Sequence, residues 1–373
     1  MRGAEDLFEA LENHYKQGLP FVVYSRPINS VIKSWLQKDD AVYETSDFTE
    51  SGFVFAPFDL NNKTILFKDT NAEHYSIEVD HLEVVDASET SVTEPEKSRS
   101  SHIRLIEEGI EDIENNRFKK IVLSRHITVD VKDANPFQIF KRLFNTYKNA
   151  MVYCWYHPKV GLWLGATPEL LFKVEGLNVT TISLAGTKPY DENNTEQWTP
   201  KEREEQKIVT DYIDNQLRPF SKSVAIKNVE TVRAGSLIHL KTRILARLES
   251  SNFKLKSIIN ALHPTPAVCG FPKDATQQFI SSKENYNREF YTGFLGELNL
   301  IVSNTRNSNR KNVENNAYKT VKRCSNFYVN LRCMQIKNSS AILYVGGGIT
   351  KDSIPEDEWQ ETVAKSKTML KVL

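Results

Sequence analysis

The chain has 373 residues, which suffices for one large α/β unit or for about two or three average domains. Its 48 basic and 48 acidic residues balance, so no overall charge favours nucleic acid or an anionic membrane as a partner, and we expect a small molecule instead. The apolar runs are too short for a membrane span, the chain start lacks the pattern of a signal peptide, and the four cysteines form no CxxC pair, so we expect a cytoplasmic protein without disulfides or structural zinc.

The predicted strands and helices follow one another without strict alternation. Runs rich in β-branched and aromatic residues predict strands, and apolar residues spaced three and four apart predict helices. Strands are predicted at 21–24, 53–56, 64–67, 121–123, 152–155, 161–164, 170–174, 231–233, 327–331 and 341–345, and helices at 101–115, 136–147, 201–217 and 355–370. This order favours an α+β fold with large antiparallel sheets and helices outside them. Residues 87–101 are polar, so we expect a surface connection there.

Three charged residues lie beside apolar segments, where an ionised side chain needs a partner. Lys120 directly precedes a predicted strand and is either a partly desolvated base or an exposed lysine at a strand end. Glu169 lies in an apolar stretch and is either a general acid with a raised pKa or a turn residue beside a proline. Glu205 extends the apolar stripe of the helix at 201–217 and either binds a cation or stays solvated at the helix end.

Three glycines, 346–348, stand between the last predicted strand and the last predicted helix. Only glycine lets the backbone approach a ligand closely, and a helix start offers unpaired N–H groups, so this layout suits an anionic, metal-bound molecule; a tight turn explains it equally well. Ser353 and Glu356 match a capping box at the helix start. Glu361 and Lys365 lie one turn apart on that helix, a spacing typical of a solvated ion pair.

Several motifs occur in a fixed order from the middle of the chain to its end. They are KKIVLSR (119–125), GATPELLFK (165–173), SLAGTKP (183–189), KEREEQKIV (201–209), the stretch 233–240 containing His239, LHPTPAVCGFPKDAT (262–276), NREFYTGFLGEL (287–298), VNLRC (329–333), VGGGI (345–349) and EWQETVAK (358–365). In this order they resemble the chorismate-utilising enzymes, and among these the isochorismate synthases. The resemblance is strong over residues 100–373 and weak over residues 1–100.

This resemblance implies one domain over residues 1–373, with two stacked antiparallel sheets ringed by helices as in component I of anthranilate synthase. It implies a Mg²⁺-dependent conversion of chorismate to isochorismate, in which water adds at one ring carbon and hydroxide leaves from another. Lys120 resembles the base that activates the water, and Glu169 resembles the acid that protonates the departing hydroxyl. Glu361 is then a metal ligand rather than half of a solvated pair.

The same resemblance assigns the remaining site residues. Glu205 and Glu361 resemble the carboxylates that bind Mg²⁺, with Glu202 and Glu358 as acids one turn behind them that hold bound water. The residues that resemble the substrate-binding groups and the pocket wall are Ala185, Gly186, Thr187, His239, Ala267, Tyr291, Arg332, Gly346, Gly348 and Lys365.

Two features depart from the family pattern. Gln206 stands where many relatives have histidine, which removes a hydrogen bond or two but no metal ligand. Residues 303–325 form a polar, basic insertion, for which we expect a solvated hairpin tip; a lid, a partner contact or steering of anions are the alternatives.

Other functions within and outside the family remain open. Synthases that use ammonia carry glutamine where Lys120 stands and threonine where Ala267 stands, so we expect no glutamine amidotransferase subunit. Salicylate synthases keep the lysine and go on to eliminate pyruvate. A catalytically silent chorismate-binding regulator would be expected to lack an acid or a metal ligand. The sequence does not decide whether the product feeds menaquinone or siderophore synthesis.

Overall fold

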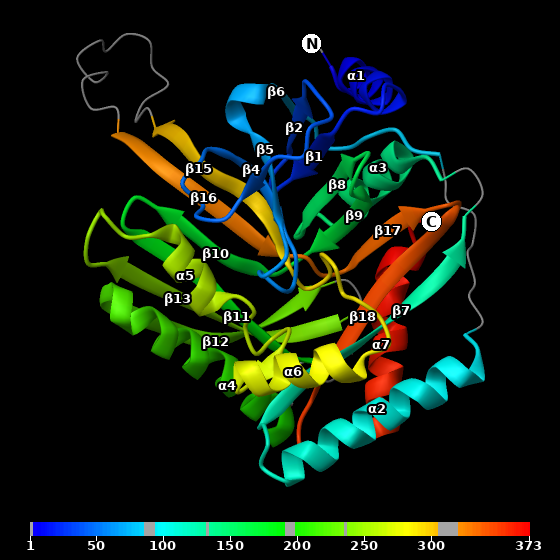
Figure 1. Cartoon of the computed structure of the whole chain (residues 1–373), viewed down its shortest axis with the longest axis vertical. Helices are drawn as coiled ribbons and strands as arrows, with labels where there is room; N and C mark the ends of the chain where they lie inside the picture. Colours follow the sequence, from blue (N-terminus) through cyan, green and yellow to red (C-terminus); the bar gives the residue numbers. More distant parts are fainter. Residues whose placement is uncertain (1–2, 86–93, 132–133, 191–197, 235–236, 305–319) are drawn as a thin grey trace.

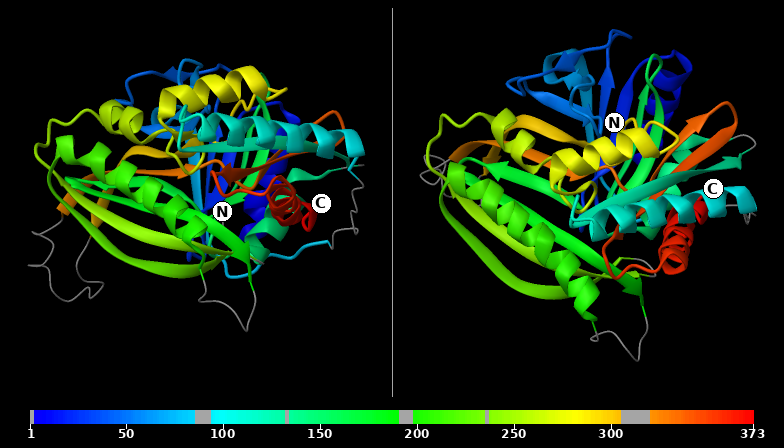
Figure 2. Two further views of the ribbon diagram at one scale, coloured as in Figure 1. Left: turned by 90° about the horizontal axis from the view of Figure 1, so that it is seen from below. Right: turned by 60° about the horizontal axis from the view of Figure 1, so that its bottom comes forward.

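The structure is a computed structural model that describes residues 3–85, 94–131, 134–190, 198–234, 237–304 and 320–373. Two antiparallel sheets of nine strands each face one another in this part of the chain, and helices cover their outer faces (Figures 1 and 2). The predicted α+β architecture of two stacked sheets is therefore confirmed. None of the helices described is long and apolar enough to cross a membrane.

The first sheet joins strands from both ends of the chain. In spatial order its strands are β14 (Gly270–Phe271), β7 (Lys120–Asp130), β18 (Ser340–Ile349), β17 (Cys333–Lys337), β9 (Gly161–Thr167), β8 (Met151–His157), β1 (Phe21–Ser25), β2 (Val31–Gln37) and β6 (Ala72–Glu78). The second sheet has the order β12 (Ser221–Ala234), β13 (Leu237–Leu248), β11 (Asn178–Pro189), β10 (Leu170–Glu175), β16 (Thr320–Val329), β15 (Phe294–Asn304), β4 (Gly52–Ala56), β5 (Thr64–Lys68) and β3 (Glu44–Thr45).

The helices surround this pair of sheets. They are α1 (Ala4–Lys16), α2 (Glu96–Glu114), α3 (Pro136–Thr146), α4 (Pro200–Leu217), α5 (Leu255–Leu262), α6 (Lys273–Lys283) and α7 (Pro355–Leu370), with short 3₁₀ turns at Asp69–Asn71 and Arg218–Phe220. Helices α1 and α3 pack on the outer face of the first sheet, and α4 and α5 pack on the outer face of the second. Helix α7 lies against β18, and α2 lies beside β7 and α7 (Figure 1).

An aromatic core fills the space between the two sheets. In β8, Trp155 points into this core, whereas Cys154 points to the helices on the outer face. Phe55 of the second sheet stacks on Phe290, with ring centroids 4.2 Å apart. Because the central strands are buried on both faces, they contain continuous apolar runs, which is why most of them could be predicted from sequence.

The differences from the predicted elements concern segment ends and elements that were not predicted. The strand predicted at 327–331 ends at Val329. The elements that were not predicted are helices α1, α5 and α6 and strands β2, β3, β6, β11, β13, β14, β15 and β17. The surface connection predicted at 87–101 is wrong at its end, because α2 already begins at Glu96. The predicted capping box is also absent: Ile354 is the residue before α7, and the hydroxyl of Ser353 donates to Glu358 instead.

Two predictions about the chain's organisation stay predictions. Most of the insertion predicted at 303–325 lies outside the described residues, which leave out 305–319. The assignment of residues 1–373 to one domain is likewise not decided by the fold.

Candidate active site

The three glycines 346–348 lie within a strand rather than in a turn. They belong to β18 and pair with β7, where Gly346 is opposite Ser124 and Gly348 is opposite Val122. Side chains of successive strand residues alternate between the two faces of a sheet. Because glycine has no side chain, the sheet has no side-chain layer on either face at this point. Other groups can therefore approach the backbone closely.

Acidic side chains occupy the space that these glycines leave open. A Cβ atom on Gly348 would lie only 2.4 Å from Glu205 Oε1, which is far closer than real contacts allow. A Cβ atom on Gly347 would lie 3.4 Å from Glu358 Oε2 and 3.5 Å from Glu361 Oε1. Helices α4 and α7 thus bring carboxylates to adjacent residues of one strand. Glu205, Glu358 and Glu361, which the resemblance assigned to the metal, thus lie beside the triple glycine. Their role at a metal stays a prediction.

Each of these acids is paired with a lysine. Lys120 Nζ lies 2.9 Å from Glu205 Oε1, and Lys201 Nζ lies 2.6 Å from Glu358 Oε1. Lys365 pairs with Glu361 one turn earlier in α7 and also donates a hydrogen bond to the Gly346 carbonyl at 2.8 Å. These six side chains form the carboxylate–lysine cluster.

Lys120 is fully buried, with 0% of its surface exposed, so the alternative of an exposed lysine is wrong. It begins β7, which places its side chain against Gly348 and Glu205. The ammonium group is close to Glu205 but makes no well-aligned hydrogen bond to any described residue. A buried ammonium with unused N–H groups is suited to hold a further polar atom, such as a water molecule or a ligand oxygen.

Glu169 lies in the turn between β9 and β10 and is only 6% exposed. Burial raises the pKa of its carboxyl group to about 7, against the opposing effects of Lys120, Lys365 and Arg332. A carboxyl group with this pKa is partly protonated at neutral pH and can donate a proton. The apolar setting that was read from the sequence therefore has the expected effect on this side chain.

Most of the predicted site residues line a cavity beside the cluster. Those that line it are Glu169, Ala185, Thr187, Glu205, His239, Ala267, Tyr291, Arg332, Gly346, Gly348, Glu361 and Lys365. Gly347 of the triple glycine also lines the cavity. The other residues of the wall were not singled out from the sequence, and they are Val122, Pro168, Leu184, Val268, Thr292, Leu331, Tyr344 and Val345. Most of these are small or apolar, and residues of this kind carry no distinctive signal in a sequence.

His239 places an unused nitrogen in the wall of this cavity. Its Nδ1 atom lies 3.1 Å from the Thr187 hydroxyl, and its buried Nε2 atom has no hydrogen-bond partner among the described residues. Burial lowers the pKa of the imidazole to about 3, and Arg332 acts in the same direction, so the ring is neutral. A neutral imidazole can donate or accept one hydrogen bond at the free nitrogen, which makes it a candidate ligand contact.

Two predicted residues have structural tasks at the start of α4. The Glu202 carboxylate accepts hydrogen bonds from the backbone N–H and hydroxyl of Thr199 in a capping box, so the structure does not bring it to the cluster. Gly186 has φ +74°, and a Cβ atom there would lie 3.1 Å from the Glu202 backbone. Glycine at this position lets α4 lie close to β11. The role of Glu202 as a metal ligand stays a prediction.

A buried ion pair that sequence reasoning missed holds the cavity wall together. Arg288 donates two hydrogen bonds to Glu284, and its other N–H groups donate to the carbonyls of Val122 and Val268 and to the Thr292 hydroxyl. Every N–H of the guanidinium group thus has an acceptor, which offsets the cost of burying the charge. Val122 of β7, Val268 and Thr292 all line the cavity. The Arg288–Glu284 pair therefore holds β7 in place relative to the segments that contain Val268 and Thr292.

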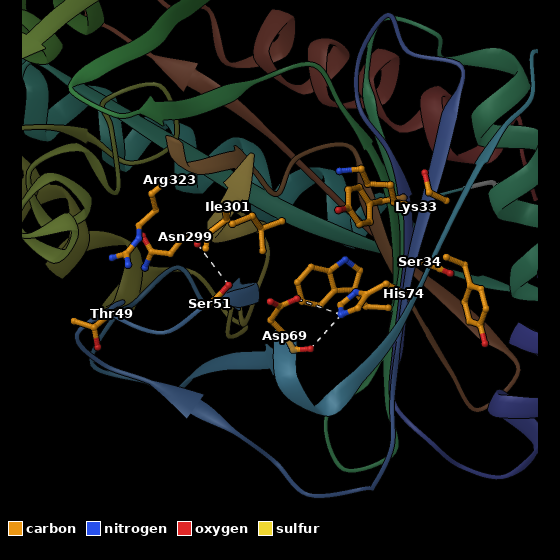
Figure 3. A pocket seen from close by; sticks show the side chains of 14 residues that line it. Lys33, Ser34, Thr49, Ser51, Asp69, His74, Asn299, Ile301 and Arg323 are labelled. Atoms are coloured by element: carbon orange, nitrogen blue, oxygen red, sulfur yellow. Dashed lines mark hydrogen bonds and ion pairs between the residues drawn. The ribbon is translucent and has the colours of Figure 1, made fainter. Parts of the chain in front are cut away.

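Larger hollows lie elsewhere in the part of the chain that the structure describes. The cavity at the cluster has a volume of about 80 Å³, whereas a hollow between β2, β6 and β15 has about 470 Å³ (Figure 3). In that hollow, His74 pairs with Asp69, and the Ser51 hydroxyl donates to the Asn299 carbonyl. We place the candidate active site at the smaller cavity, because a carboxyl group with a pKa of about 7 and three lysine–glutamate ion pairs converge there.

A sequence comparison shows to which protein family this chain belongs. A sequence profile described as chorismate binding enzyme matches residues 59–302 and 318–373. The chain belongs to the chorismate-binding enzyme family. The matched ranges leave out residues 303–317, which fall within the segment predicted as an insertion.

Named members of the family are moderately similar to the chain. It is 29% identical over 301 residues to isochorismate synthase DhbC of Bacillus subtilis, which covers 76% of this chain and 69% of that protein. It is 30% identical over 265 residues to isochorismate synthase EntC of Escherichia coli, covering 68% of this chain and 62% of that protein. The structure of MenF, the menaquinone-specific isochorismate synthase of Escherichia coli, matches with a TM-score of 0.77 at 19% identity, over 95% of this chain and 88% of that chain. At this identity the structural match shows a shared fold.

The triple glycine provides a test with a matched control. We expect Gly348→Ala to reduce chorismate consumption by about 100-fold or more, because its Cβ would displace Glu205 and misplace the cluster. Gly347→Ala makes only ordinary contacts, and we expect it to lose less than about tenfold. Steady-state kinetics of both variants check this. Equal activity in the two variants would contradict the geometry.

Glu169 is expected to destabilise the fold at high pH. Below pH 4.5 both states keep its proton; between pH 4.5 and 7 only the folded state keeps it, so stability falls as the pH rises through this range. Relative to wild type, Glu169→Gln should therefore gain roughly 2 to 3 kcal/mol between pH 5 and pH 8. Urea unfolding at both pH values measures the gain. Glu249→Gln, at an exposed position, serves as the control. An equal response of the two variants would contradict the raised pKa of Glu169.

Proposed function

We propose that this protein is an isochorismate synthase that converts chorismate to isochorismate with Mg²⁺. Family membership supports chorismate as the ligand, and several named relatives are isochorismate synthases. The observation that carries the proposal is the presence, in and beside one cavity, of Glu169 with a pKa of about 7 and of the buried Lys120. These two groups fit an acid and a base that act on opposite sides of one ring.

The acid and the base have distinct tasks in this proposal. After its ammonium group has released a proton, Lys120 holds the attacking water as a neutral amine and takes a proton from it as the new C–O bond forms. Glu169 gives its proton to the departing hydroxyl, so that water rather than hydroxide leaves. After burial, Lys120 is the strongest influence on the pKa of Glu169, which supports their proximity. Protons lost at one side of the ring and gained at the other balance over the reaction.

Chorismate carries two carboxylates, and the cavity offers cationic and neutral donors for them. Arg332 and Lys365 line it together with the Tyr291 hydroxyl and the backbone of Gly346 and Gly348. Arg332 has a planar guanidinium group, which can bind a carboxylate with two parallel hydrogen bonds. We assign these residues to holding the substrate carboxylates.

The donor set of the cluster fits Mg²⁺. This ion prefers carboxylate oxygens and usually keeps several water molecules, so a few carboxylates suffice. Within the described residues, no three acid, histidine or cysteine side chains form a ready-made metal site. Glu205 and Glu361 would hold the ion directly, with Glu358 contacting its water. When bound, Mg²⁺ supplies positive charge for a substrate carboxylate.

The alternatives differ at particular residues or products. Lys120 and Ala267 do not match the glutamine and threonine of the ammonia-using relatives, which favours water as the nucleophile. A silent regulator is disfavoured because Lys120, Glu169, Glu205 and Glu361 are all retained. A salicylate synthase would release pyruvate, and product analysis separates it from an isochorismate synthase.

The proposal is tested by product analysis on wild type and a lysine variant. Incubation of the pure protein with chorismate and Mg²⁺ should give isochorismate without pyruvate. Lys120→Met should lower kcat by about 10² to 10⁴, the usual effect of losing a general base, and leave chorismate binding largely intact. Chromatography of the products and calorimetry with chorismate measure both effects.

The neighbouring lysine provides the control for this experiment. Lys119 is exposed, and Lys119→Met removes the same charge without reaching the cavity, so its kcat should stay within about twofold of wild type. Near wild-type kcat in Lys120→Met would remove the assigned base. Salicylate and pyruvate as products would instead favour the runner-up activity.

A further inference from the structure

Lys201 is the one lysine of the cluster that no proposed catalytic step uses. It lies in the first turn of α4 and reaches across to Glu358 of α7, with 2.6 Å between Nζ and Oε1. Glu358 is only 3% exposed in its side chain, whereas Lys201 is 26% exposed. This ion pair therefore connects the two helices that carry the metal-binding acids.

The charges around Lys201 come from more than its direct partner. Glu358 together with Glu361 and Glu205 raises the pKa of the Lys201 ammonium, against the opposing effect of burial. Lys201 thus lies in the negative field of all three acids near the triple glycine. These acids carry three negative charges when ionised, and Lys120, Lys201 and Lys365 balance them one to one.

The other two lysines are held in the site by further contacts. Lys120 is fully buried, and Lys365 also donates a hydrogen bond to the Gly346 carbonyl. Lys201 hydrogen-bonds only to Glu358 among the described residues, and its partial exposure gives its ammonium a path to solvent. Of the three lysines, it can leave the cluster most readily.

We propose that Lys201 is the resident counter-ion of the acid cluster and that a divalent cation must compete with it. This inference rests on the proposed function, because it assumes that Mg²⁺ binds between Glu205 and Glu361. Without the ion, the ammonium neutralises Glu358 and links α4 to α7. When the ion is present, two positive groups share the same acids and repel each other, which weakens Mg²⁺ binding.

A second effect of Lys201 acts in the opposite direction. By binding Oε1 of Glu358, the ammonium leaves Oε2 facing Gly347, which orients the carboxylate toward the site. The Ser353 hydroxyl donates to the same Oε1 atom at 2.6 Å and therefore maintains this orientation without Lys201. Because Ser353 also maintains the orientation of Glu358, the loss of Lys201 should mainly remove a positive charge near the ion. We therefore expect the repulsion between Lys201 and Mg²⁺ to determine the Mg²⁺ affinity.

The test is a calorimetric titration of Mg²⁺ alone into the full chain at pH 8. Lys201→Met keeps the aliphatic stem and removes the charge, and we expect its Kd for Mg²⁺ to fall by about tenfold, equivalent to 1.4 kcal/mol. Lys201→Arg keeps the charge and should not bind Mg²⁺ more tightly than wild type.

The control removes the same charge elsewhere on the same helix. Lys207 is largely exposed and pairs with Asp211, so Lys207→Met should leave the Kd within about twofold of wild type. Thermal unfolding in EDTA gives a second readout: Lys201→Met should unfold at a lower temperature than wild type, because Glu358 loses its partner, and added Mg²⁺ should raise its melting temperature more.

The outcomes separate this inference from the proposed function. An unchanged or weaker Mg²⁺ affinity in Lys201→Met overturns the inference, even if wild type makes isochorismate. Weaker binding would show that Lys201 acts mainly by orienting Glu358. If neither wild type nor variant binds Mg²⁺, both the cofactor assignment and this inference are wrong.

Discussion

Helices α4 and α7 approach the same short stretch of β18 because residues 346–348 have no side chains. Any larger residue at position 348 would collide with the Glu205 carboxylate. The pairing of β18 with β7 brings Lys120 to the same place. One backbone constraint thus determines where acids from two helices and a lysine from a neighbouring strand converge. The conformational cost of glycine in a strand, roughly 0.5 to 1 kcal/mol each, is the price of this convergence.

Bringing several charges together in a poorly solvated place requires that each has a partner. The cluster achieves this with three lysine–glutamate pairs, and the cavity wall achieves it with Arg288 and Glu284, which are almost completely buried. Glu169 differs, because burial raises the pKa of its carboxyl group. This side chain avoids the cost of a buried charge by keeping its proton, whereas the other acids are paired with a lysine. The same physical cost is therefore met by ion pairs at one side of the site and by a carboxyl group with a raised pKa at the other.

The sequence predicted the parts of the fold and site that depend on local patterns. Continuous apolar runs identified most central strands, and the apolar stripe of α4 indicated the side of the helix on which Glu205 meets Lys120 and Gly348. Contacts between distant segments were not accessible in this way. Nothing in the local pattern joins Lys201 to Glu358, 157 positions later, or places Arg288 against β7. The resemblance to a family supplied site residues that periodicity could not.

Local rules also failed where a side chain found a better partner in space. Ser353 has the sequence context of a helix cap, yet its hydroxyl binds the buried Glu358 carboxylate. Glu202, which the resemblance assigned to the metal, caps α4 through Thr199, and its role at the metal stays a prediction. For Ser353 the position of the Glu358 carboxylate decides the outcome, and this position depends on tertiary packing.

The central claim is that acids from α4 and α7 hold one cation beside the triple glycine. Crystals of the protein with chorismate and Mn²⁺, whose anomalous scattering locates it, test this most directly. The account predicts a single Mn²⁺ peak next to Gly347 and Gly348, within bonding distance of Glu205 and Glu361. A peak elsewhere, or none at this place in crystals that contain bound chorismate or its product, would contradict it.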